Sequence, residues 1–73
     1  MATTHLKAIV TGMVWKIERQ AGERVEAGEV VMILESMKME IPLEAQAAGI
    51  VRELLVAEGE AVTEGQQVAV LIA

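Results

Sequence analysis

The sequence predicts an all-β fold, a flattened barrel or sandwich of two antiparallel sheets, and three observations lead to this prediction. Short segments rich in β-branched residues alternate with glycine turns, which is typical of sandwiches and barrels. The chain also contains an internal repeat. Each half of that repeat carries two glycines at the same spacing. We therefore expect one domain over residues 1–73, built from two halves related by a pseudo-twofold axis.

The internal repeat appears when the sequence is shifted by 37 positions, which aligns 10 identical residues in 36 pairs without a gap. Nearly all of these identities are glycines and aliphatic residues, the types that set backbone shape and core packing. They pair Leu6 with Leu43, Ala8 with Ala45, Gly12 with Gly49, Val14 with Val51, Gly22 with Gly59, Glu23 with Glu60, Val25 with Val62, Gly28 with Gly65, Val31 with Val68 and Leu34 with Leu71. The repeat indicates two copies of one backbone shape that share one core.

Six strands are predicted from segments rich in aliphatic and β-branched residues. They cover residues 6–10, 13–18, 30–34, 39–43, 50–56 and 68–72. The motifs Gly-Glu-x-Val-x-x-Gly at 22–28 and 59–65 predict two tight surface loops. Their glycines turn the chain at positive φ or allow close backbone approach, and Val25 and Val62 are expected to face inward.

A helix over residues 30–41 is the main alternative for the middle of the chain. Apolar residues recur there at helical spacing, and Pro42 would end such a helix. These residues are Val30, Ile33, Leu34, Met37 and Ile41. The repeat argues against the helix, because the matching segment 68–71 stands two residues from the last residue of the sequence and is too short for a stable helix.

The composition excludes several classes of function. A net charge of −5 with Trp15 as the only aromatic residue argues against nucleic-acid binding. The longest apolar run, 30–34, is too short to span a membrane, and no secretory signal is seen, so a cytoplasmic protein is expected. There is no cysteine, and His5 lies in a segment expected to be frayed. We therefore expect no catalytic residue, no metal site, and a monomer in isolation.

The turn between the two central predicted strands is the exception to the local rules. If residues 30–35 and 39–43 are both strands, a tight turn must lie within Ser36, Met37 and Lys38. None of these is Asn, Asp, Gly or Pro, the residues that such turns prefer. A site that breaks its local rule while its surroundings obey is where function is expected. The turn would project Lys38 from the end of the molecule, and the two Gly-Glu loops are expected to lie away from it.

The sequence Met37-Lys38-Met39 in this turn resembles the attachment site of the biotinyl domains of biotin-dependent carboxylases. The resemblance covers nearly the whole chain, including both Gly-Glu-x-Val-x-x-Gly loops, and is greatest to small biotin/lipoyl attachment proteins similar to the biotin carboxyl carrier of acyl-CoA carboxylases. It implies that a biotin protein ligase attaches biotin to Lys38, with Met37 and Met39 as flanking recognition residues. The biotin arm would then shuttle a carboxyl group from a biotin carboxylase to a carboxyltransferase. One departure is Thr11, where relatives often have proline before the glycine.

Two other functions are compatible with the same fold. A lipoyl carrier domain would also project a lysine, but that family typically has Asp-Lys-Ala at the tip. An unmodified biotinyl-like adaptor would be expected to lack the lysine. Two side chains also have alternative roles: Met39 either packs inward or contributes to recognition, and Trp15 is expected to cover the barrel in preference to docking a partner.

Overall fold

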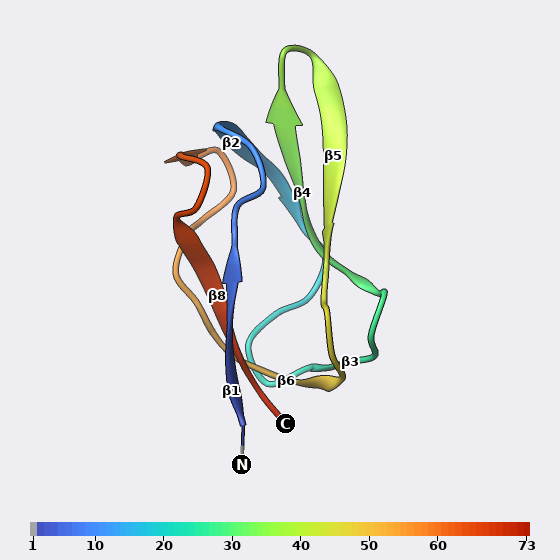
Figure 1. Ribbon diagram of the computed structural model, residues 1–73. Coiled ribbons are helices and arrows are strands. Elements are labelled where there is room, and N and C mark those ends of the chain that lie inside the picture. Colours follow the sequence, from blue (N-terminus) through green and yellow to red (C-terminus); the bar gives the residue numbers. More distant parts are fainter. Residues whose placement is uncertain (1) are drawn as a thin grey trace.

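The computed structural model describes residues 2–73 and arranges them in two four-stranded antiparallel sheets (Figure 1). The strands are β1 (Thr3–Lys7), β2 (Gly12–Ile17), β3 (Arg24–Val25), β4 (Val30–Ser36), β5 (Met39–Glu44), β6 (Gly49–Leu54), β7 (Ala61–Val62) and β8 (Gln67–Ile72). One sheet has the order β1-β8-β6-β3 and the other the order β5-β4-β2-β7. The predicted all-β fold of two antiparallel sheets is confirmed.

The internal repeat relates the two sheets strand by strand. A shift of 37 residues superposes β1, β2, β3 and β4 in sequence on β5, β6, β7 and β8. Under this exchange the order β1-β8-β6-β3 becomes β5-β4-β2-β7, which is the order of the second sheet. Even the bulges recur, at Trp15 in β2 and at its counterpart Arg52 in β6. The predicted pseudo-twofold arrangement is therefore present in the hydrogen-bonded pairing and not only in the sequence.

The core lies between the two sheets and is made from the repeated residues. Val14, Val51, Val31 and Val68 are fully buried, and no polar or charged side chain is buried among residues 2–73. Val25 and Val62, the central valines of the two loops, also face inward as predicted, with exposed fractions of 0% and 3%. Each fully buried aliphatic side chain contributes about 1.5–3 kcal/mol through loss of contact with water. Because the chain has no cysteine, this shared core stabilises the fold without a disulfide.

The strand boundaries agree with the prediction except at the first strand. β1 covers Thr3–Lys7, whereas the sequence pattern predicts a strand over 6–10. The ladder with β8 shifts between Leu6 and Lys7, and the amide of Ala8 then donates to the carbonyl of Gln66 in a loop. Ile9, whose apolar character produced the prediction, is 53% exposed.

The helix considered for residues 30–41 is absent, because this segment forms β4, the turn and the start of β5. No helix that is both long and apolar enough to cross a membrane occurs in residues 2–73.

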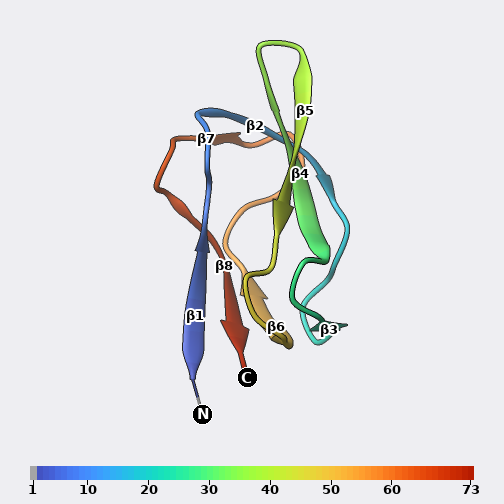
Figure 2. The same cartoon turned by 45° about the vertical axis from the view of Figure 1, so that its right-hand side comes forward.

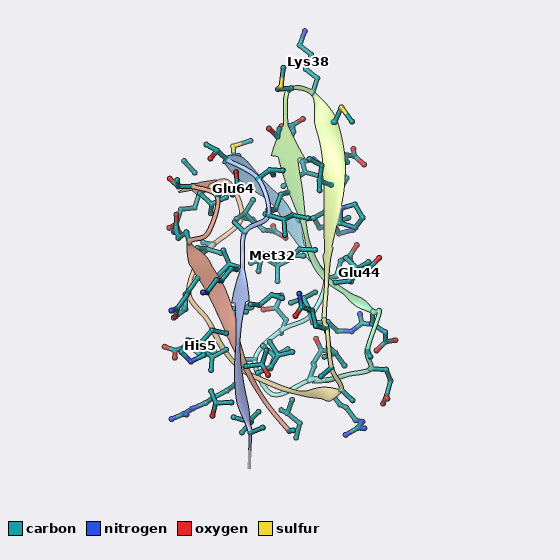
Figure 3. All side chains as sticks on the ribbon, viewed as in Figure 1. His5, Met32, Lys38, Glu44 and Glu64 are labelled. Carbon is teal, nitrogen blue, oxygen red and sulfur yellow. The ribbon has the colours of Figure 1, made fainter. Side chains whose placement is uncertain are left out.

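The N-terminal segment is ordered in a strand, so the expectation of a frayed end at His5 is wrong. His5 stands opposite Val70 in the β1–β8 ladder, and its Nδ1 lies 3.0 Å from the side-chain oxygen of Gln67. Five residue pairs join β1 to β8, which explains the order. His5 lies far from Lys38, as Figure 3 shows.

The two Gly-Glu loops have the predicted tight turns. Gly22, Gly28, Gly59 and Gly65 have φ values of 95°, 88°, 89° and 89°. In each turn the residue after the glycine donates its amide to the carbonyl three residues earlier, as from Glu23 to Gln20 at 3.1 Å. This pattern matches a type II turn, whose third residue requires positive φ. The short strands β3 and β7 inside these loops were not predicted, because two residues are too few to show a period.

Only one of the two loops lies away from Lys38, which corrects the expectation for the other. The pseudo-twofold axis places β3 and loop 22–28 at one end and β7 and loop 59–65 at the end that carries the β4–β5 hairpin (Figure 2). β7 pairs with the beginning of β2, and the amide of Val14 donates to the carbonyl of Glu60 at 2.9 Å. The second loop therefore borders the base of the lysine hairpin.

Substitution of Gly22 or Gly59 by valine tests the turns. Each variant should lose about 1–3 kcal/mol of unfolding free energy, because a β-branched residue is strained at positive φ. A clash does not contribute, since no atom lies within 4 Å of a Cβ placed at either glycine. Urea denaturation measures the loss, and Ala21→Val, at the exposed neighbouring position, should stay within about 0.5 kcal/mol of the wild type. Equal stability of all three variants would contradict the turn assignment.

Candidate functional site: the lysine hairpin

The β4–β5 hairpin extends beyond the rest of the molecule and carries Lys38 at its tip (Figures 1 and 3). Pairing between β4 and β5 continues to the pair Ser36–Met39, whereas pairing of β4 with β2 stops at Glu35. The last strand pair and the turn therefore have no further strand beside them. They form one end of an elongated molecule with dimensions of 36 × 17 × 16 Å.

The turn itself consists of two residues with left-handed backbone. Met37 and Lys38 have φ values of 54° and 65°, and they are the only residues other than glycine with positive φ in the described chain, 2–73. A two-residue hairpin loop with both φ values positive matches a type I′ turn, for which Asn-Gly is preferred. Left-handed backbone costs each of these residues roughly 1–2 kcal/mol. The tight turn expected from the sequence is present, and it is strained.

The strain follows from how the two strands end. The β4–β5 ladder remains in register up to Ser36 and Met39, which leaves only two residues to reverse the chain. Type I′ geometry suits the right-handed twist of the strands, whereas an unstrained type I turn would splay them. β4 contributes the buried residues Val31, Met32 and Leu34 to the core. The core thus sets the register of β4, and the register imposes the turn.

The three residues of the Met-Lys-Met sequence all face solvent. Met37 is 91% exposed, Met39 is 64% exposed, and Lys38 is also exposed. Met39 therefore does not pack inward, which decides between its two possible roles in favour of a surface position. Among residues 2–73 the salt bridges are Arg19–Glu29 and Arg24–Glu26, so the ammonium of Lys38 has no carboxylate partner. The tip offers an accessible amine without any group of this chain placed to activate it.

The base of the tip carries two like charges directly opposite each other. Glu35 on β4 faces Glu40 on β5, and neither forms a salt bridge in the described chain. Like charges opposite one another on neighbouring strands destabilise the pair. These carboxylates give the lysine end a negative potential, which suits a partner with basic groups around its binding surface.

A hydrogen-bonded connection between the hairpin and the body was missed by sequence reasoning. The hydroxyl of Ser36 donates to the carbonyl of Thr11 at 2.9 Å, and the Thr11 hydroxyl accepts the amide of Glu64 at 3.0 Å. The signal was present in the repeat, because Ala48 and Ala73 stand at the positions equivalent to Thr11 and Ser36. Hydroxyl residues thus occur only at the lysine end.

Trp15 and the main surface concavity lie apart from the tip. Trp15 is 44% exposed on β2 and is not part of the buried core, so it covers its sheet only in part. An open groove of about 990 Å³ runs between β1 and β5 and is lined by Pro42 and Glu44 among others, but not by Lys38. The lysine is therefore presented on a protrusion and not in a substrate pocket.

This combination of fold and site defines the class of protein. Two equivalent sheets form a compact support, and one strained hairpin projects an exposed lysine from it. Within residues 2–73 no group of three or more His, Cys, Asp or Glu residues could hold a metal ion. The architecture is that of a small attachment domain, which offers a side chain for modification.

Comparisons with known proteins identify the family within this class. Residues 3–71 match the family model described as "Biotin-requiring enzyme". The chain is 50% identical over 56 residues to the biotin/lipoyl attachment protein of Bacillus subtilis, covering 77% of each chain. It is 36% identical over 66 residues to the biotinylated protein TB7.3 homolog of Mycobacterium leprae, covering 90% of this chain and 93% of the relative. The crystal structure of the urea carboxylase of Kluyveromyces lactis matches with a TM-score of 0.92 and 36% identity, over 99% of this chain and 6% of that one. The chain belongs to the biotin/lipoyl attachment domain family.

Replacement of Lys38 by glycine should make the protein more stable, because glycine adopts positive φ without strain. Relief of roughly 1–2 kcal/mol is partly offset by the greater entropy of glycine in the unfolded chain, so a net gain of about 0.5–1 kcal/mol is expected. Thermal unfolding measures the change. The matched control is Lys16→Gly in β2, which has no positive φ and should lose about 0.5–1 kcal/mol. A destabilised Lys38→Gly variant would show that the turn is not strained.

Proposed function

We propose that this protein is a biotin carboxyl carrier and that Lys38 is the residue to which biotin is attached. The observation that carries the proposal is the exposed lysine on a strained two-residue turn, in a chain of the biotin/lipoyl attachment family. When bound, biotin would carry a carboxyl group from a biotin carboxylase to a carboxyltransferase. The chain itself would act as a carrier subunit or substrate of these enzymes and not as an enzyme.

Attachment requires an external enzyme. A biotin protein ligase would supply biotin as an acyl adenylate, the neutral amine of Lys38 would attack the acyl carbon, and the amide would form as AMP leaves. Lysine amines are protonated in neutral solution, so the ligase must also take the proton. No side chain of this chain forms a hydrogen bond or salt bridge with Lys38 within residues 2–73. The contribution of the protein is therefore to present the amine free of obstruction.

The hairpin also sets the reach of the modified side chain. The lysine side chain and the valeryl tail of biotin together span about ten bonds, which gives an arm of very roughly 12 Å. An arm of this length on a tip without neighbouring strands can enter one active site and then another while the sheets stay folded. The carrier would raise the effective concentration of the group at both sites.

Biotin is favoured over lipoate by the residues that flank the lysine. Met37 and Met39 are exposed on both sides of Lys38 and have no packing role there, so they are available for recognition by the ligase. The Mycobacterium leprae relative is named as a biotinylated protein. The Bacillus subtilis relative is named for both groups, so a lipoyl carrier is the second candidate. We also propose a cytoplasmic location, where the ligase and carboxylase partners would act.

Intact mass after co-expression with a biotin protein ligase tests the proposal. The wild-type chain should gain the mass of one biotinyl group and bind streptavidin, whereas Lys38→Arg should keep its fold and gain nothing, because a guanidinium is too weak a nucleophile. Parallel expression with a lipoate ligase and lipoate should leave the wild type unmodified. Biotin on the Lys38→Arg variant, mapped to Lys7 or Lys16, would overturn the assignment. Lipoylation in place of biotinylation would establish the second candidate.

A further inference from the structure

The hairpin that carries Lys38 is connected to the body through two hydroxyl residues, which we call the Thr11–Ser36 latch. The Ser36 hydroxyl donates to the carbonyl of Thr11, and the Thr11 hydroxyl accepts the amide of Glu64 in the β7–β8 connection. Three separate segments therefore meet at the base of the tip. No other side-chain hydrogen bond in the described chain, residues 2–73, joins the end of the hairpin to the body.

The end of the hairpin needs such a connection. Pairing with β2 stops at Glu35, so the residues beyond it are not supported by a neighbouring strand. The opposed carboxylates of Glu35 and Glu40 repel each other at this point, and the turn above them is strained. Without the latch, only the two strands of the hairpin would determine the direction in which Lys38 points.

The internal repeat provides a control for what the fold itself requires. Gly12 and Gly49 are equivalent, and both allow close approach of a neighbouring strand: a Cβ at Gly12 would overlap the carbonyl oxygen of Glu35, and a Cβ at Gly49 would lie 2.7 Å from that of Ile72. This close approach is therefore a feature of both halves. The hydroxyls are not, because the equivalents of Thr11 and Ser36 are Ala48 and Ala73. The fold tolerates alanine at both positions, so the hydroxyls serve the lysine end specifically.

We propose that Thr11 and Ser36 are positioning residues that hold the hairpin, and with it Lys38, in one orientation for the ligase. This inference rests on the proposed function, in which the Lys38 amine is acylated by a ligase. A tip that is already ordered binds with less loss of conformational freedom than one that the ligase must order first. The latch should therefore lower the KM of the ligase for the carrier and leave the chemical step at the amine unchanged.

The test is the double variant Thr11→Ala/Ser36→Ala, which places at the lysine end the residues that the other half already has. It should remain folded, and its KM for biotinylation should rise about 2- to 12-fold, the factor that corresponds to the net free energy of one hydrogen bond. Its kcat should change less than twofold. Ser36→Thr, which keeps a hydroxyl, should retain the wild-type KM. Thr3→Ala removes a hydroxyl at the opposite end of the molecule and should also leave KM unchanged.

Amide ¹⁵N relaxation of the unmodified proteins gives a second readout, which does not depend on the ligase. The amides of Met37 and Lys38 should become more mobile in the double variant, while those of β2 should not. An unchanged KM together with unchanged relaxation would overturn the latch. If the wild-type chain takes up no biotin, the proposed function fails, and the relaxation data alone then decide whether the latch orders the hairpin. A rise in KM for Thr3→Ala as well would show a general loss of stability and would also overturn the proposal.

Discussion

Closure of the β4–β5 ladder on the pair Ser36–Met39 is the constraint on which the functional end of this protein depends. β4 lies between β5 and β2, and its buried residues anchor it in a core that both sheets share. Burial of each such side chain is worth about 1.5–3 kcal/mol, which over a whole strand exceeds the roughly 1–2 kcal/mol that each left-handed residue of the turn costs. The core can therefore impose the turn on Met37 and Lys38, although neither favours it.

The pseudo-twofold arrangement separates what the fold needs from what the function adds. Counterpart positions supply the same valines to the core and the same glycines to the turns. The two ends differ at a single place. The equivalents of Ser36 and Met39 are Ala73 and Ala2, which are joined only by a hydrogen bond of 3.0 Å between backbone groups. Where one end has the lysine turn and its latch, the other end has the two ends of the described chain.

Much of the fold and the position of the lysine could be predicted from the sequence, because both follow from periodicity and the repeat. Val25 and Val62 were predicted to face inward from their place between two glycines, and the turn at Lys38 from the strands on either side. The start of β1 was wrong because apolar character at Ile9 does not report a bulge that turns the chain out of the sheet. The latch was missed because a bond from a hydroxyl to a carbonyl 25 residues away depends on the packing of three segments.

The central claim is that the two sheets hold Met37 and Lys38 in left-handed backbone in the free protein, so that the amine is presented before any partner binds. The most direct measurement is NMR determination of both φ angles, from the amide–Hα coupling and the intraresidue amide–Hα nuclear Overhauser effect, in the unmodified chain in solution. The account predicts values in the left-handed region at both residues, close to 54° and 65°. Couplings averaged over extended and helical backbone at Met37 and Lys38, with the rest of β4 and β5 intact, would contradict it.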